Sequence, residues 1–441
     1  MMESQAGRLT LRDVLRRIGP AFIVGACVIG PGSITLMSRT GSLYGYSMLW
    51  LSLLSGALMA CFIALFMRLG VLSDDTFLGL TARKLGRWYA ALCGVSVFCV
   101  AAAFQFGNCL GVTAGMNMLL EGVPKLVWPI AFTLAAITFM FAFRRIYAII
   151  EKMMTFFLVL MLVAFATNLL WARPDVPGIL KGICVPTIPQ DMDWVTIGGL
   201  VATTFSIAAA FFQSYLVKAK GWGERHLVSG ITDTVLGSIM LTLIGSVIMM
   251  TAAAVLHPKG VEVTSATAMA RQLEGVFGPY AKLVFCIGFW SAAFSSFVTN
   301  ALVGGVLMND GIGLGGKLDS VPTKAFSTLV LLVGMITALL IIAGAPPATP
   351  PAPSAAQPAP APRAQIEIKA IVVGQAATLV AVPLGTIAML VVLFDRRATK
   401  GRPLPVWAKL VVPVGAVVLL AIAARTLMRI WPSLREILPF G

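Results

Sequence analysis

The feature that most constrains this chain is a series of long apolar runs that charged residues seldom interrupt. A helix needs about 20 mainly apolar residues to cross the hydrocarbon core of a bilayer. Charged residues make up 12% of the 441 residues and hydrophobic residues 58%, whereas soluble domains carry about 25% charged residues. So few charges cannot cover a water-facing surface, and the surplus apolar surface must face lipid. We therefore expect an all-α integral membrane protein that has the lipid bilayer as a partner.

Eleven apolar runs are long enough to span the membrane, and a segment of different composition separates the ninth from the tenth. This segment, residues 345–365, reads APPATPPAPSAAQPAPAPRAQ. Its prolines prevent a regular helix, so a semi-rigid spacer on the outer side is expected. The eleven predicted spans cover residues 18–41, 47–70, 89–117, 125–143, 150–171, 194–218, 228–256, 278–306, 323–344, 368–394 and 406–428.

The basic residues are distributed unevenly between the connecting segments. With a cytoplasmic N-terminus, the inner segments contain most of the 33 Lys and Arg residues, as the positive-inside rule requires. The odd number of spans then places the C-terminus outside. The net charge of +15 follows from these loops, so no nucleic-acid partner is expected. The predicted location is a bacterial-type inner (plasma) membrane.

The first predicted span contains the sequence Gly30-Pro31-Gly32 near its middle. Proline removes a backbone donor and clashes with the preceding turn, and glycine weakens a helix. Freed backbone groups at membrane depth must be buried in protein or line a cavity, and many transporters build their midplane sites in this way. The tripeptide therefore predicts a broken helix at a binding site, although a simple proline kink has the same signature.

The sixth span has a small and polar centre but no proline to mark a break. Its polar residues include Thr203 and Ser206, and small residues of this kind also serve ordinary helix packing. Other polar residues within or beside spans are candidates for a pathway, and those near the cytoplasmic ends are equally consistent with a loop or helix-terminus role. These candidates are Gln105, Asn108, Glu151, Asp233, Asp310 and Gln375.

Five segments, in addition to the Arg68-Leu69-Gly70 end of the second span, are similar in order to the Nramp (natural resistance-associated macrophage protein) family of divalent metal transporters. The resemblance runs over roughly 16–425. Its strongest part is the run from Gly30 to Trp50, where the family has an Asp-Pro-Gly-Asn motif and then Gly-x-x-Tyr-Gly-Tyr-x-x-Leu-Trp. Two of the five matching segments, the motif and the run that follows it, lie within GPGSITLMSRTGSLYGYSMLW (30–50). The other three are QSYLVKAKGW (213–222), FGPYAKLVFCIGFWSAAFSSFVTNALVGG (277–305) and QAATLVAVP (375–383).

The resemblance implies a LeuT-type fold with two five-helix inverted repeats plus an eleventh helix. It implies a cytoplasmic segment at 1–17, repeats at 18–171 and 194–394, the extra helix at 406–428 and a tail at 429–441. It also implies a substrate or ion site between the broken first and sixth helices. Residues implied for that site, either as ligands or as neighbours in the two motifs, are Cys27, Gly30, Pro31, Gly32, Ser33, Thr203, Ser206, Ala208 and Gln375.

The chain departs from the family at these positions. Gly30 stands where the family has its metal-binding aspartate, Ser33 replaces the asparagine, and Ser206-Ile207-Ala208 replaces a Met-Pro-His motif. The remaining ligands are neutral oxygens, and divalent cations are usually held by anionic oxygens or matched soft ligands. A site of this composition should bind Mn²⁺ or Fe²⁺ weakly, and Gly30→Asp is expected to increase divalent-cation binding.

Two readings of the cargo remain open. A largely hydrated divalent cation of the Mn, Fe or Mg class could pass through a neutral site. Alternatively, the N-terminus of a half-helix starting near Ser33 could hold the carboxylate of a small organic acid or amino-acid-like solute. A receptor or scaffold without transport would instead have a sealed centre. No enzyme or nucleotide motif is present, so an enzyme, a cofactor and an ATP motor are not expected, and transport would be driven by a gradient.

Overall fold

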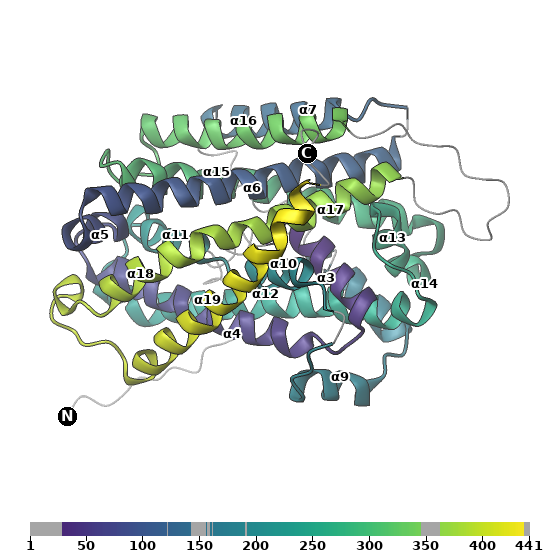
Figure 1. Cartoon of the computed structure of the whole chain (residues 1–441), viewed down its shortest axis with the longest axis horizontal. Coiled ribbons are helices and arrows are strands. Elements are labelled where there is room, and N and C mark those ends of the chain that lie inside the picture. The colour runs from purple at the N-terminus through teal and green to yellow at the C-terminus, as the bar shows by residue number, and fades with distance from the viewer. Residues whose placement is uncertain are drawn as a thin grey trace.

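The computed structural model describes residues 29–120, 122–142, 156, 159–160, 162–189, 192–344 and 362–435, and within them the chain is built of helices (Figure 1). The N-terminal segment 1–17, Cys27, Glu151 and most of the proline-rich spacer lie outside these residues. The α-helices are α3 (Pro31–Tyr44), α4 (Leu49–Leu72), α5 (Phe77–Leu85), α6 (Arg87–Leu119), α7 (Val127–Ala142), α9 (Val176–Cys184), α10 (Trp194–Thr204), α11 (Ile207–Ala219), α12 (Leu227–Val255), α13 (Ala266–Ala270), α14 (Glu274–Phe277), α15 (Ala281–Gly311), α16 (Val321–Gly344), α17 (Pro362–Ala377), α18 (Val382–Leu393) and α19 (Val406–Arg435).

Every predicted span contains helix. Among the described residues, eight helices or helix pairs are long and apolar enough to cross a membrane. They correspond to the second, third and sixth to eleventh predicted spans. Shorter apolar helices at Val127–Phe141 and Leu162–Trp171 correspond to the fourth and fifth, and α3 is the described part of the first.

The helices form two groups that enclose the start of α3. In one group α15 packs along α6 and both contact α16, with α7 beside them (Figure 1). In the other, α12 packs against α4 and α3, and α11 against α4. The α17 helix touches both α6 and α10, while α19 crosses α10 and α17 on the outside. The most apolar stretch of the α10–α11 span is buried throughout, so this broken span lies at the centre.

Within the described residues one helix begins inside a predicted span and two further spans are interrupted, each for a different local reason. Residues 29–30 are extended and α3 begins at Pro31, the first-turn position where the missing N–H of proline costs nothing. The sixth span breaks at Phe205 and Ser206, both of which have extended backbone angles. The tenth span passes through a 3₁₀ turn, Thr378–Ala381, before α18 begins with Pro383 in its first turn.

The loop between α18 and α19 is fastened to the predicted cytoplasmic ends of other spans. Its 3₁₀ turn, Arg396–Thr399, lies beside the α4–α5 connection and the 3₁₀ turn Glu224–His226. The hydrogen bond from Lys400 lowers the pKa of Asp74, and the same bond raises the pKa of Lys400. The loop's ion pairs are Lys84–Asp395 (2.8 Å), Lys400–Asp74 (2.9 Å) and Arg402–Glu224 (2.5 Å).

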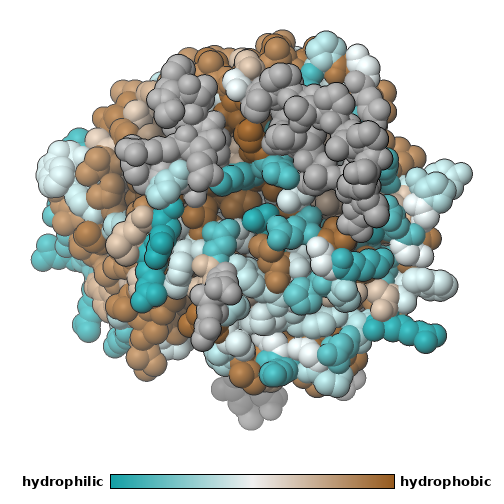
Figure 2. Space-filling view, turned by 45° about the vertical axis from the view of Figure 1, so that its right-hand side comes forward, coloured by the Kyte–Doolittle hydropathy of each residue, from teal (hydrophilic) through white to brown (hydrophobic). Residues whose placement is uncertain are grey.

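The surface separates apolar from polar regions in the way a membrane protein requires. Figure 2 turns the end of the molecule that carries α9, α13 and α14 toward the viewer, and hydrophilic side chains gather across the middle of this face. Hydrophobic side chains follow its rim and flank. Peripheral helices such as α16 and α19 bury only a minority of their most apolar stretch, so the remainder is available to lipid.

Candidate functional site

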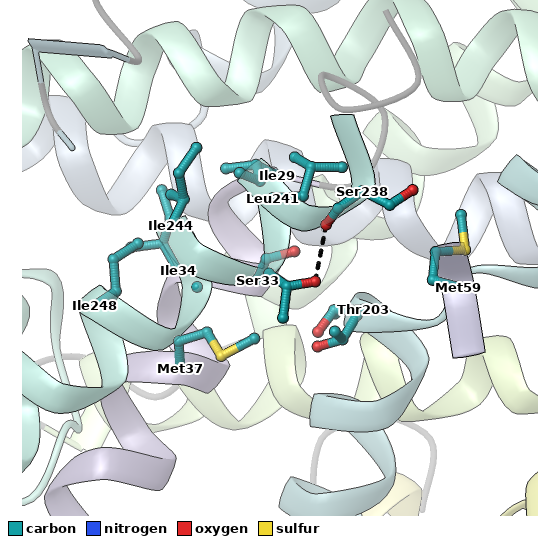
Figure 3. A pocket seen from close by; sticks show the side chains of 13 residues that line it. Ile29, Ser33, Ile34, Met37, Met59, Thr203, Ser238, Leu241, Ile244 and Ile248 are labelled. Carbon is teal, nitrogen blue, oxygen red and sulfur yellow. Dashed lines mark hydrogen bonds between the residues drawn. The ribbon is translucent and has the colours of Figure 1, made fainter. Parts of the chain in front are cut away.

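A small cavity of about 20 Å³ lies between α3, α4, α10 and α12, next to the start of α3 and the break in the sixth span (Figure 3). We call it the central cavity. Its wall is mainly apolar with a few hydroxyl groups, the usual composition of a small-ligand site. Its lining residues are Ile29, Ser33, Ile34, Met37, Met59, Thr203, Thr204, Ser238, Leu241, Thr242, Ile244, Gly245 and Ile248.

The central cavity brings together Ser33 and Thr203, which the sequence had placed in one site. Their side chains face the same space, and the thioethers of Met37 and Met59 approach it from different sides (Figure 3). Sequence reasoning missed both methionines because each looks like an ordinary apolar residue inside a span. The site therefore contains sulfur donors, although none stands at the position of the family's methionine.

The break in the sixth span turns two helix ends toward this region. The α10 helix ends at Thr204, and the last carbonyls of a helix have no partner within it, so they carry a partial negative charge. The Ser206 side chain caps α11 by accepting a hydrogen bond from Ala209 N at 3.3 Å. Ser206 and Ala208 are buried but do not line the central cavity, so their predicted part in the site remains a prediction.

Gln375 lies against the first turn of α3. A Cβ atom on Gly32 would be 2.2 Å from Gln375 Nε2, and one on Gly107 would be 3.0 Å from it. Gln375 is fully buried, and neither amide atom has a hydrogen-bond partner among the described residues. Only glycine at residue 32 leaves room for this amide.

Gly30 faces a polar cluster contributed by α6 and α15. A Cβ atom on residue 30 would lie 2.8 Å from Ser296 Oγ and 3.0 Å from Asn108 Oδ1. Asn108 Nδ2 donates to Ser296 Oγ at 3.1 Å, and Asn300 Nδ2 donates to the same oxygen at 2.7 Å. Pro31 packs so closely on α6 that a Cβ on Gly111 would be 2.3 Å from its ring.

The acidic residues flagged as pathway candidates lie elsewhere. Asp310 accepts a hydrogen bond from Tyr215 OH at 2.5 Å near the end of α15. Asp233 is buried near the start of α12 and is absent from the lining of the central cavity. Within the described part of the chain, no three His, Cys, Asp or Glu residues are grouped to hold a metal. The site is thus built from neutral oxygen and sulfur donors.

Comparison with known proteins gives a consistent result. Residues 21–350 match the family described as natural resistance-associated macrophage protein-like. The divalent metal cation transporter MntH of Caldanaerobacter subterraneus subsp. tengcongensis is 23% identical over 343 residues, which is 76% of this chain and 79% of that protein. MntH of Bacillus subtilis is 24% identical over 303 residues, 67% of this chain and 71% of its own.

Solved structures agree on the fold. The Eremococcus coleocola manganese transporter, bound to an aromatic bis-isothiourea substituted compound, superposes with a TM-score of 0.77 at 14% identity, covering 98% of this chain and 89% of that one. Mhp1, a nucleobase-cation-symport-1 family transporter, gives 0.54 at 14% identity, covering 96% and 92%. These neighbours confirm the expected all-α membrane fold of LeuT type, whereas the repeat boundaries remain a prediction. Since the family match spans most of the sequence and the helices superpose on a solved relative, the chain belongs to the Nramp family of membrane transporters.

Proposed function

We propose that this chain is a gradient-driven carrier of divalent metal cations and that its cargo passes through the central cavity. The relatives named as divalent metal cation transporters support this cargo. The observation that carries the proposal is that the start of α3 and the break in the sixth span meet at a cavity lined by Ser33, Thr203 and two thioethers.

The chemistry of these donors restricts the form in which a cation binds. Anionic ligands normally offset the free energy of removing water from a divalent ion, and Mg²⁺ in particular gives up its water reluctantly. Hydroxyls, amides and the carbonyl end of α10 supply only partial negative charge. We therefore propose a cation of the Mn, Fe or Mg class that keeps part of its hydration shell, with low affinity and easy release.

The alternative cargo, an organic acid or amino-acid-like solute, fits the same geometry less well. A carboxylate at the N-terminus of α3 would need the space around the first turn. The amide of Gln375 occupies that space, because it approaches Gly32 too closely for even one additional carbon atom. A divalent cation at the cavity side of α3 meets no such obstacle.

The proposed cargo is tested by uptake into proteoliposomes that contain a fluorescent indicator for Mn²⁺ or Mg²⁺. Protein-dependent, saturable uptake is expected. Gly245→Leu should abolish it, since residue 245 lines the cavity and a Cβ there would already be 2.9 Å from Met37 Cε. Gly223→Leu is the matched control, because residue 223 has open space around it. Wild-type protein that moves neither ion above the level of empty liposomes refutes the proposal.

The orientation is proposed on the charge distribution of the loops: N-terminus in the cytoplasm and C-terminus outside. Cys184, which ends the exposed helix α9, then lies outside the cell. A membrane-impermeant maleimide should label Cys184 in intact cells, and Cys184→Ser should remove the signal. Labelling that requires broken cells would reverse the proposed orientation.

A further inference from the structure

Around the start of α3 lie side-chain amide atoms that have no hydrogen-bond partner among the described residues. Asn108 is 1% exposed and Gln375 is 0% exposed, yet Asn108 Oδ1 and both amide atoms of Gln375 lack a hydrogen-bond partner among the described residues. A buried polar group without a partner destabilises the fold, because it has lost its hydrogen bonds to water. Several such groups lie around one extended segment, where they are available to a bound cation.

The direction of the Asn108 amide is set by its neighbours. Its Nδ2 donates to Ser296 Oγ at 3.1 Å, and Ser296 Oγ also accepts from Asn300 Nδ2 at 2.7 Å. With its nitrogen engaged on the α15 side, Asn108 presents Oδ1 to Gly30, 3.0 Å from the point where a Cβ would stand. The oxygen thus occupies the region where a side chain on residue 30 would begin.

We infer that Asn108 of α6 supplies the oxygen ligand that Gly30 cannot, and that its Oδ1 binds the cation beside residue 30. The inference rests on the proposed function and assigns a further ligand to it. Amide carbonyl oxygens are hard, neutral donors of the kind that suits Mg²⁺, Ca²⁺ and Mn²⁺. In the family the first helix supplies the side-chain oxygen at this place, whereas here the third span supplies it through Asn108. The site carries no net charge.

The test is isothermal calorimetry of MnCl₂ and MgCl₂ binding to the full chain in nanodiscs, with two opposite changes at residue 108. Asn108→Asp keeps Oδ1 and adds charge, and the Ser296 hydroxyl can turn to donate to the carboxylate while still accepting from Asn300. Its affinity for Mn²⁺ should rise about 10-fold or more, as charge count tunes such sites. Asn108→Leu removes the oxygen at similar volume and should reduce binding below detection.

Gln213→Glu is the matched control. Gln213 is fully buried on α11, its Oε1 also lacks a partner among the described residues, and its Nε2 donates to Thr234 Oγ1 at 3.2 Å. Unlike Asn108, it is not among the nearest neighbours of residue 30 or residue 32, so the same added charge should leave Mn²⁺ affinity unchanged. Equal gains at residues 108 and 213 would reduce the effect to general charge and overturn the inference.

The two proposals fail in distinguishable ways. Wild-type uptake of Mn²⁺ or Mg²⁺ with Asn108→Asp affinity unaltered overturns the ligand assignment alone. Absence of wild-type uptake overturns the proposed function, whatever the variant binds. If Asn108→Leu does not fold, the gain expected for Asn108→Asp still decides the assignment, because a residue that only holds a structural water would give no gain.

Discussion

The contact between residue 30 and α15 makes a quantitative prediction for Gly30→Ala. The backbone at residue 30, with φ −121° and ψ −178°, is extended and open to any amino acid. The obstacle is steric, because the new Cβ would lie 2.8 Å from Ser296 Oγ, 3.1 Å from Ser296 Cβ and 3.0 Å from Asn108 Oδ1. Overpacking of a tight interior costs about 1–3 kcal/mol, and we expect a loss of that size in the free energy of unfolding.

Removing atoms from Ser296 should relieve the conflict in steps. Ser296→Ala removes Oγ, the nearest atom, and Ser296→Gly removes both Oγ and Cβ. Glycine inside a helix itself lowers stability by about 0.5–1 kcal/mol. Either change also takes the acceptor from Asn108 and Asn300, so each single variant is itself destabilised. The double-mutant cycle separates these effects, and we expect a favourable coupling of about 1–2 kcal/mol with Gly30→Ala, larger for Ser296→Gly.

The assay is reversible unfolding in mixed micelles, followed by tryptophan fluorescence, with size-exclusion profiles as a check on folding. Gly223→Ala is the control, since residue 223 also precedes a helical turn and has nothing within 4 Å of a new Cβ. If Gly30→Ala is as stable as Gly223→Ala, or if the Ser296 variants show no coupling, the packing argument is wrong. By the same reasoning, Gly30→Asp should gain its expected divalent-cation binding fully only when combined with Ser296→Gly.

Three further predictions follow from other contacts. Ser206→Ala should lower the free energy of unfolding by about 1 kcal/mol through loss of the α11 cap, and Ser206→Asn should restore it in the same micelle titration. Gly32→Ala should abolish folding or uptake because its Cβ overlaps Gln375; adding Gln375→Ala should restore folding but not Mn²⁺ uptake, and restored uptake would argue against a ligand role. The hydrogen bond from Lys84 lowers the pKa of Asp395. The pair therefore stabilises the fold fully above the ordinary carboxyl pKa of about 4, and this stabilisation is lost as the pH falls through the lower pKa of Asp395 in the folded protein. Asp395→Asn should therefore lower the melting temperature at pH 7, and this loss should shrink as the pH falls through the lowered pKa of Asp395 in the folded state. An equal loss at pH 7 and in strong acid would refute the role of charge.

The architecture was largely readable from the sequence, because a bilayer permits few solutions. Long apolar runs predict spanning helices, and Gly30-Pro31-Gly32 predicts a break at the place where α3 begins. The break at Phe205 and Ser206 was much harder to predict. A fully buried span has no polar face and so no periodicity to interrupt, and the small polar residues at its centre, which include the N-cap Ser206, also serve ordinary helix packing.

The site was less predictable because its contacts join distant parts of the chain. Asn108 could be noted as a polar residue inside a span, but its partner Ser296 is 188 positions away. Met37 and Met59 carry no pattern that separates cavity-lining sulfur from core packing. Only the tertiary structure turns these residues into neighbours of one helix start.

The packing around residue 30 also changes the meaning of its missing carboxylate. Had Gly30 been an isolated replacement, an empty volume would remain where the family's aspartate stands, and a single reverse substitution would restore the site. Instead Ser296 and Asn108 fill that volume from two other helices, and Ser296 Oγ accepts hydrogen bonds from both Asn108 and Asn300. The side chains at residues 30, 108 and 296 therefore depend on one another, because the size and polarity of each limits which side chains fit at the other two positions. The absence of a carboxylate at residue 30 fits the way α6 and α15 pack on the start of α3, so restoring one there requires a compensating substitution at Ser296.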